Sequence, residues 1–342
     1  MVWAAGDTLQ AGKYTVEREL GRGRLGITYL ARDKDHHRLV IKTLNDTLLT
    51  SLPPEERNRL ETKFNQEAVK LRSCIHPHIV KVRELFKEGE RWCIALEYVD
   101  GMSLAERSQK VLSEVEALNY IQQIGEALIV VHHNHLIHRD VKPGNIIVRV
   151  RGGKPEAVLI DFDLALDVQN QISTVRTQEA SDGFAPVELY SRQAQNPGEY
   201  TDVYSLAATL YELLTGNKPV SAIKRKLDRE RLVPPKDFNI QNNLISDRTN
   251  RMILWGMELE PKKRPQSVRE WLDSLGLITQ NSTPLPSPPP SSGLSLEQKI
   301  LIWTLIATLI GSLGALLGGI GDFGSLFKPD SPASPTSSPT RR

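Results

Sequence analysis

The side chains with the most evident chemistry lie in residues 135–148, HLIHRDVKPGNIIV. Asp140 stands five positions before Asn145, and Lys142 lies between them. An aspartate carboxylate can accept a hydroxyl proton, an asparagine amide can ligate a metal ion, and a lysine can meet the charge of a phosphate. Apolar residues on either side predict two short strands that present these side chains on the loop between them. The spacing predicts phosphoryl-transfer chemistry, against the alternative of a surface loop with unrelated charges.

Three glycines near the start of the chain form a second motif. Gly21, Gly23 and Gly26 follow the order GxGxxG within residues 14–33, which read as two strands joined by a glycine turn. Without side chains, glycines let the backbone approach a phosphate closely. A dinucleotide-binding site is the alternative, but it needs a helix after the glycines. The β-branched and aromatic stretch ITYLA that follows predicts a strand instead.

Lys42 lies on the next predicted strand, residues 37–44. A lysine that emerges from a buried strand needs an anionic partner, because burial otherwise favours its neutral form. A nucleotide phosphate and a carboxylate of the helix predicted at residues 53–74 would supply that charge. Glu67 lies beside the apolar stripe of this helix and could reach inward to Lys42. Glu61 is the competing partner, and the pattern FxxEA favours Glu67.

Two further apolar stretches complete the predicted nucleotide site. The backbone of Glu97 to Val99 follows a predicted strand and is expected to hold an adenine. Residues 157–160 predict a buried strand that delivers Asp161 to a metal ion also held by Asn145. The alternative for Asp161 is an aspartate that caps a turn at the strand end.

The length, composition and net charge of the chain restrict the classes of protein to which it can belong. A chain of 342 residues with 39% hydrophobic residues can build roughly two domains or lobes. Its net charge of +2 comes from interspersed acids and bases, so we expect no nucleic-acid partner. The two cysteines, Cys74 and Cys93, fit buried thiols in a reducing compartment. The first residues lack a secretory signal, which predicts that the bulk of the chain is cytoplasmic.

The composition changes near residue 280. Residues 279–298 are rich in proline and serine and predict a semi-extended linker. Residues 300–320 carry no charge, and at about 1.5 Å per residue a helix there would span about 31 Å, the thickness of a bilayer core. A buried globular helix is the alternative. The tail, residues 321–342, is predicted to be disordered.

These motifs together resemble the eukaryotic-like (Hanks-type) serine/threonine protein kinases of bacteria. The resemblance covers residues 14–278. It implies an α+β, bilobal protein-kinase fold, with a β-rich N-lobe at about 14–99 and a mainly α-helical C-lobe at about 100–278, plus one C-terminal transmembrane helix. It also implies transfer of the γ-phosphoryl group of ATP, with Mg²⁺, to serine and threonine hydroxyls of protein substrates.

The resemblance assigns roles to single residues. The glycines cover the phosphates, Lys42 contacts the α- and β-phosphates and pairs with Glu67, Asp140 accepts the hydroxyl proton, and Lys142 steadies the γ-phosphate. Metal ligands are Asn145 and Asp161. The implied ATP-binding residues are Gly21, Gly23, Gly26, Thr28, Val40, Lys42, Glu97, Val99 and Ile147. The implied structural residues are His138, Arg139, Glu188, Asp202 and Arg264, with Glu188 paired to Arg264 and Asp202 bonded to the backbone near His138 and Arg139.

The chain departs from the family after Asp161. The usual DFG reads DFD, and Asp163 in place of glycine reduces backbone freedom and adds charge near the metal. Slower switching of this segment and an altered metal preference, with Mn²⁺ as a possible alternative to Mg²⁺, are the hypotheses that this departure suggests. The following segment, up to Glu188, is the predicted activation loop, with Ser173, Thr174 and Thr177 as candidate phosphosites and Arg139 as their cation. Thr28 and Val40 replace the usual valine and alanine, so we expect ATP to bind less tightly.

The uncharged segment at residues 300–320 leads to two further predictions, one on location and one on oligomeric state. Because catalytic lobes need cytoplasmic ATP, we expect a single-pass protein of the cell membrane, in contact with membrane lipid, with its kinase domain in the cytoplasm. Small residues recur every four positions at Ala307, Gly311, Ala315 and Gly319, which favours a homodimer through close helix packing.

Two rival functions stay open. A pseudokinase scaffold would bind nucleotide with weak or no phosphotransfer, and DFD supports it. A small-molecule phosphotransferase is the other, and the predicted elements around Glu188 and Arg264 count against it. The intact set of catalytic residues favours an active serine/threonine kinase in signalling.

Overall fold

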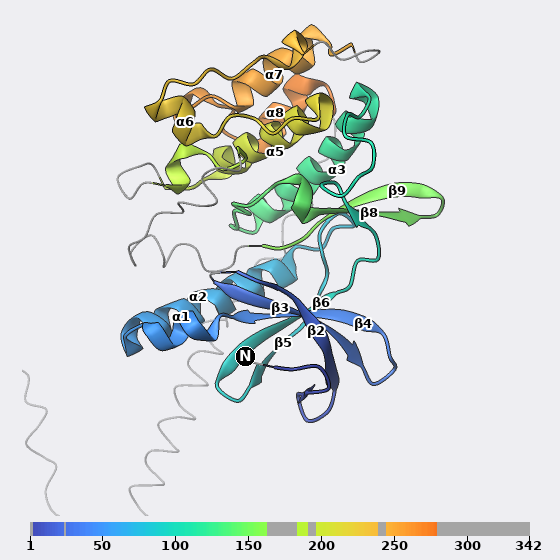
Figure 1. Ribbon diagram of the computed structural model, residues 1–342, viewed down its shortest axis with the longest axis vertical. Helices are drawn as coiled ribbons and strands as arrows, with labels where there is room; N and C mark the ends of the chain where they lie inside the picture. The colour runs from blue at the N-terminus through green and yellow to red at the C-terminus, as the bar shows by residue number, and fades with distance from the viewer. Residues whose placement is uncertain (1–2, 24, 163–182, 191–195, 239–243, 279–342) are drawn as a thin grey trace, which may run out of the picture. The chain divides into compact units, whose positions relative to one another are not determined.

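The computed structural model describes residues 3–23, 25–162, 183–190, 196–238 and 244–278 (Figure 1). The predicted α+β arrangement is confirmed, with a strand-rich N-lobe followed by a mainly helical C-lobe. The predicted linker, transmembrane segment and tail at residues 279–342 lie outside the described residues. In the part of the chain that the structure describes, every helix is too short or too polar to cross a bilayer.

The N-lobe is built on one antiparallel sheet. Its six strands lie, from one edge to the other, in the order β1 (Thr8–Leu9), β2 (Tyr14–Arg22), β3 (Gly26–Asp33), β4 (Arg38–Leu44), β6 (Arg91–Glu97) and β5 (Val82–Glu88). Alternation along β4 buries Leu39 and Ile41 on one face and leaves Val40 and Lys42 on the other. The sheet therefore separates its packed face from the face that carries Lys42.

Two helices accompany this sheet. The short helix α1 (Asp46–Ser51) follows β4, and α2 (Pro54–Ser73) packs against β5 and β6 (Figure 1). Proline at the first position of α2, glutamates in its first turn and basic residues in its last turn all favour a helix with these bounds. Its buried side chains, Leu60, Phe64, Glu67, Ala68 and Leu71, recur at helical spacing.

The C-lobe packs around one helix that is apolar on nearly all sides. This helix, α5 (Glu199–Thr215), contacts α3 (Glu114–His133), α7 (Asp247–Gly256) and α8 (Val268–Leu275) (Figure 1). A second sheet, in the order β7 (Met102–Ser103), β8 (Ile146–Arg151) and β9 (Lys154–Leu159), lies beside α3. The remaining elements are α6 (Ala222–Leu227) and the 3-10 turns η1 (Pro143–Asn145), η3 (Val187–Leu189), η4 (Pro235–Asp237) and η5 (Pro261–Lys263).

One expectation about the loop at Asp140 is wrong. The strand that follows the loop forms as β8, but the strand predicted before it, at Leu136 and Ile137, does not. The backbone N–H groups of the next two residues donate to the carboxylate of Asp202 rather than to a neighbouring strand. Leu136 is buried in the apolar core without sheet pairing, and Ile137 is only partly buried.

The contact between α5 and α7 supplies a first test of the packing. A Cβ atom on Gly256 would lie 2.6 Å from the Cβ of Ala207 and 3.1 Å from the indole nitrogen of Trp271. We expect Gly256→Ala to lower the free energy of unfolding by about 1–3 kcal/mol through overpacking. Urea unfolding measures this change.

The partner side of the same contact gives the control. Ala207→Gly in the Gly256→Ala background makes room for the added methyl group, so the double variant should recover part of the lost stability. Equal stability of Gly256→Ala and wild type would contradict the close approach of the two helices, as would a purely additive double variant.

Candidate active site

The carboxylate of Asp140 lies between a lysine and an amide. Lys142 Nζ is 3.1 Å from Asp140 Oδ1 and 3.0 Å from Oδ2. Asn145 Nδ2 donates to Asp140 Oδ2 at 2.7 Å and to the Asp140 carbonyl oxygen at 2.8 Å. Both amide hydrogens of Asn145 are thereby used, so its Oδ1, the atom suited to a metal ion, points away from Asp140. The turn η1 sets this geometry, with Asn145 N bonded to the Lys142 carbonyl at 2.9 Å.

A buried aspartate holds the loop from below. Asp202, on α5, accepts hydrogen bonds of 2.8 Å from the backbone of His138, the backbone of Arg139 and Nε2 of His132. Arg139 has a φ of 68°, an unfavourable conformation for a residue with a Cβ, which this anchor holds in place. Burial opposes ionisation of Asp202, but the bonds and charge of His132 outweigh it and keep the pKa of Asp202 below its usual range.

Asp161 reaches the same site from the end of β9. Ile160, directly before it, bonds through its N–H to the Asn145 carbonyl at 2.9 Å and through its carbonyl to His138 Nε2 at 3.0 Å. Asp161 itself has a φ of 59°, and its side chain is 48% exposed. These bonds fix the strand end against the loop of Asp140.

Lys42 lies against Asp161, from which it is separated by 119 positions in the sequence. Its Nζ is 2.6 Å from Asp161 Oδ1 and donates to the Phe162 carbonyl at 2.8 Å. The charge of Lys42 lowers the pKa of Asp161, and Lys142 adds a smaller effect in the same direction. Asp161 is therefore ionised at neutral pH and presents a carboxylate to this site.

Among the described residues, the structure pairs Glu67 with Lys63 and Lys42 with Asp161, where a pair of Lys42 with Glu67 was expected. Glu67 is buried on α2, and its carboxylate lies 3.3 Å from Lys63 Nζ, one helical turn away. Lys42 is held by Asp161 and the Phe162 carbonyl instead. The local i,i+4 geometry of α2 favours the Lys63 contact.

The other predicted nucleotide-site residues lie on the elements expected of them. Thr28 stands directly opposite Lys42 in the β3–β4 register, and Val40 stands opposite Leu96. Of the three glycines, Gly26 has the least room: a Cβ there would lie 3.0 Å from the Thr43 carbonyl oxygen. Gly21 lies in β2, paired with Thr28 of β3, and Gly23 lies in the turn that follows β2.

The residues expected at the adenine end are placed as follows. Glu97 ends β6, and its carboxylate accepts from Lys81 N at 3.0 Å and lies 3.5 Å from Arg149. These contacts occupy the Glu97 side chain, and the Glu97 N–H donates to the Lys81 carbonyl at 2.9 Å. Val99 follows as a buried residue, and Ile147 pairs with Ser103 in the second sheet.

The structure brings Glu188 and Arg264 together. Their charged atoms are 2.7 and 3.0 Å apart, both side chains have no exposed surface, and Thr201 also donates to Glu188 at 3.0 Å. Arg264 further donates to the carbonyls of Tyr200, Glu258 and Leu259. The candidate phosphosites Ser173, Thr174 and Thr177, and Asp163, lie outside the described residues.

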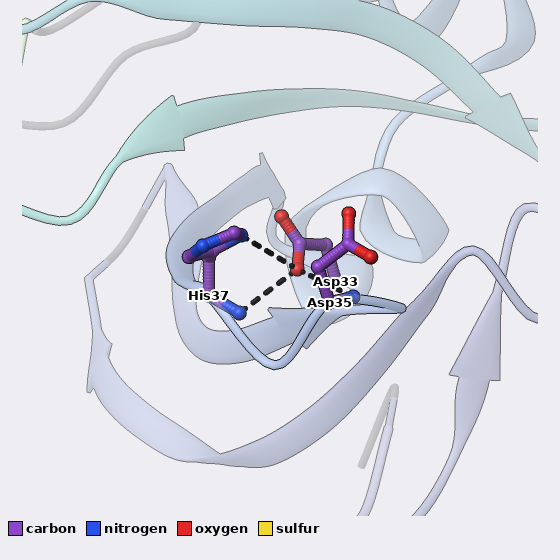
Figure 2. Close-up of side chains that lie close together, drawn as sticks. All are labelled: Asp33, Asp35 and His37. Atoms are coloured by element: carbon purple, nitrogen blue, oxygen red, sulfur yellow. Dashed lines mark hydrogen bonds and ion pairs between the residues drawn. The ribbon is translucent and has the colours of Figure 1, made fainter.

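A separate group of titratable side chains lies in the turn between β3 and β4. Figure 2 shows Asp33, Asp35 and His37 close together. Asp33 Oδ1 accepts from the backbone of Asp35 at 3.0 Å and of His37 at 2.8 Å, and Arg83 binds Oδ2 at 3.2 Å. These bonds explain the group as an aspartate that stabilises a hairpin turn.

Known proteins with similar sequences agree with this arrangement of side chains. The family model described as the protein kinase domain matches residues 14–274. The chain belongs to this family. A probable serine/threonine-protein kinase of Clostridium acetobutylicum is 30% identical over 284 residues, covering 80% of this chain and 41% of that protein. The serine/threonine-protein kinase PrkC of Bacillus subtilis is 32% identical, covering 61% of this chain and 31% of PrkC.

Solved structures agree on the fold of the kinase domain. The PknI kinase domain of Mycobacterium tuberculosis superimposes with a TM-score of 0.58 at 27% identity, covering 80% of this chain and 99% of that domain. The chain spans less than half the length of the two curated relatives.

The sequence offered signals for two site residues that we did not predict. Lys63 precedes Glu67 by four positions, the spacing of a helical ion pair. Asn45 precedes Asp46 at the start of a helix, a pattern typical of an N-cap. Both sequence patterns are common on surface helices. They indicate a functional residue only when the structure shows what the side chains contact.

The anchor of this kinase domain predicts a pH dependence. His132 Nδ1 also lies 3.4 Å from Glu199 Oε2. Burial disfavours the imidazolium, but the hydrogen bond to Asp202 and the nearby carboxylate of Glu199 outweigh it and raise the pKa of His132 to about 9. Because this pKa is raised above the ordinary value, the stabilisation is full below about pH 6.5 and is lost as pH rises through 9.

We expect the free energy of unfolding to fall by up to about 3 kcal/mol across that window because of His132. His132→Gln keeps a hydrogen-bond donor for Asp202 but cannot titrate. Urea unfolding of both proteins from pH 6.5 to 9 gives the comparison, and parallel curves would rule out a charged His132.

Proposed function

We propose that this chain is a serine/threonine protein kinase that transfers the γ-phosphoryl group of ATP to hydroxyl groups of protein substrates. The observation that carries the proposal is the convergence of Asp140, Lys142, Asn145, Asp161 and Lys42 through the contacts of Ile160 and Asp202. Three separate parts of the chain supply these residues. In this grouping the charge of Lys42, with a smaller effect of Lys142, lowers the pKa of Asp161, so that Asp161 offers a carboxylate to a metal ion.

The donor set suits Mg²⁺. Asn145 Oδ1 and the Asp161 carboxylate are hard oxygen ligands, and Asp161 is both ionised and half-exposed. A bound divalent cation would neutralise charge on the phosphates. Mn²⁺ accepts the same ligands.

The other side chains of the site have separate roles in phosphoryl transfer. Asp140 accepts the proton of the attacking hydroxyl, because its carboxylate is 31% exposed while its orientation is fixed by Asn145. Lys142 and Lys42 are cations on two sides of the site, suited to the phosphates of the nucleotide. Lysine two positions after Asp140, together with the names of the two curated relatives, supports serine and threonine as acceptors.

Membrane attachment and signalling form the second part of the proposal. The uncharged residues 300–320 would span a bilayer once, with the kinase domain in the cytoplasm, and their small residues would support a homodimer. Membrane fractionation of the full chain against a chain lacking residues 300–320 tests the attachment. Equal recovery of both in the soluble fraction would contradict it.

The catalytic proposal is tested with ATP labelled on its γ-phosphate, Mg²⁺ and a generic basic protein. We expect label on serine and threonine of that protein, and none when the label is on the α-phosphate. Nucleotide binding without any transfer would favour the pseudokinase scaffold. Transfer to small molecules alone would favour the third class of function.

A further inference from the structure

We propose that Asn45 is a positioning residue for the nucleotide phosphates, because its side chain ties the glycine turn of β2–β3 to the start of α1. This inference rests on the proposed function, since it concerns the same ATP site. The inference adds Asn45 to the residues of this site. Asn45 lies outside the glycine turn and holds the turn in place before nucleotide binds.

Three hydrogen bonds define the turn. Asn45 Nδ2 donates to the Gly23 carbonyl at 2.8 Å, and Asn45 N donates to the Leu25 carbonyl at 2.7 Å. Gly23 N donates to the Gly26 carbonyl at 2.9 Å and closes the turn itself. Asn45 is 8% exposed, so water competes little for its amide.

The other end of the same amide caps α1. Asn45 Oδ1 accepts from Thr47 N at 3.0 Å, the contact of an N-cap residue. Aspartate and serine can accept this bond equally well, but an ionised aspartate has no hydrogen to donate to Gly23. The amide is thus needed for the turn and not for the helix.

A tether matters here because glycines are conformationally free. Fixing a flexible backbone costs conformational entropy, and glycine loses more freedom than other residues. A turn already held by Asn45 spares the nucleotide part of that ordering. The tether also fixes the turn to β4, whose Lys42 lies three positions before Asn45, so the turn and the lysine keep one geometry.

A second contact between the glycine turn and the start of α1 is weaker than the Asn45 bonds. Arg22 lies 3.4 Å from Asp46, but it also pairs with Glu19, and all three side chains are partly exposed. Exposed pairs of this kind contribute little. The buried amide of Asn45 therefore carries the attachment.

The test uses the full chain with Asn45→Asp and Asn45→Ser, both of which keep an acceptor for the cap. Ionised aspartate has no hydrogen to donate, and the serine hydroxyl lies one covalent bond nearer the backbone than the amide nitrogen, which leaves it short of the Gly23 carbonyl. Binding of Mg²⁺-ATP is measured by calorimetry, and backbone hydrogen exchange of residues 21–26 is measured without nucleotide. We expect both variants to raise the Kd about three- to tenfold and to speed exchange in the turn, with kcat at saturating ATP within about twofold of wild type. Ser113→Asp, at the cap of α3, is the control for a charge added at a helix start and should change neither quantity.

The outcomes separate the two proposals. Wild type that binds no nucleotide would overturn the proposed function. Wild type that binds while both variants keep its Kd and exchange rates would overturn the tether. A raised Kd in Asn45→Asp alone would also overturn it, because added charge and not the lost donor would then be the cause.

Discussion

Replacing Asp140 by asparagine is expected to lower kcat for protein phosphorylation by about a hundredfold to ten-thousandfold. The variant has nearly the same shape but no carboxylate to accept the hydroxyl proton. Asn145 can still bond to a side-chain oxygen at position 140 and to the backbone carbonyl, so the loop should keep its conformation. ATP affinity should stay within about twofold, because Lys42 and Asp161 are unchanged.

Steady-state kinetics with labelled ATP and calorimetric ATP binding separate these two effects. Asp237→Asn, an exposed position on η4, is the matched control for the loss of one carboxylate and should leave kcat unchanged. Equal incorporation by Asp140→Asn and wild type would remove Asp140 from the chemistry. Loss of ATP binding in the variant would mean that the residue supports the nucleotide site instead.

The loop at Asp140 could be predicted because its chemistry is local. Asp140, Lys142 and Asn145 lie within six positions, and their hydrogen bonds run between one another. Their residue types alone therefore specify which atoms meet. The strand β4 and the helix α2 were also predicted, since alternation of apolar residues and helical spacing are properties of the sequence. The short elements β1 and α1 were not predicted.

Contacts between distant segments could not be worked out from pattern in the same way. The proximity of Glu188 and Arg264, 76 positions apart, followed only from a family resemblance. The partner of Lys42 depends on where α2 and the end of β9 lie, and both carry a carboxylate of suitable reach. The strand expected at Leu136 fails for the same reason, because its neighbouring N–H groups find Asp202 more than sixty positions away.

Asn45 marks a different limit. Its capping role was readable from its place before a helix, but its second contact depends on the direction of the Gly23 carbonyl. A turn between two strands leaves that direction open until the tertiary structure sets it. A residue that connects a regular element to a turn is thus difficult to identify from the sequence alone.

Replacing Arg264 by methionine should lower the free energy of unfolding by about 3–5 kcal/mol. The change leaves the Glu188 carboxylate buried without its cation and removes hydrogen bonds to the carbonyls of Tyr200, Glu258 and Leu259. Because both side chains have no exposed surface, water cannot replace the lost partner. Urea unfolding followed by tryptophan fluorescence measures the loss, since Trp255 and Trp271 lie in the same lobe.

A second replacement distinguishes the unpaired charge from lost packing. Glu188→Leu combined with Arg264→Met removes both charges, so the double variant should be more stable than Arg264→Met alone. Lys263→Met, next to Arg264 but exposed and paired with the exposed Glu260, is the control and should change stability little. If the double variant were no more stable than the single one, the buried carboxylate would not be the source of the cost. If Arg264→Met matched Lys263→Met, the pair would contribute nothing to the fold, and the segment that carries Glu188 would have to be held by its apolar contacts and the Thr201 hydrogen bond.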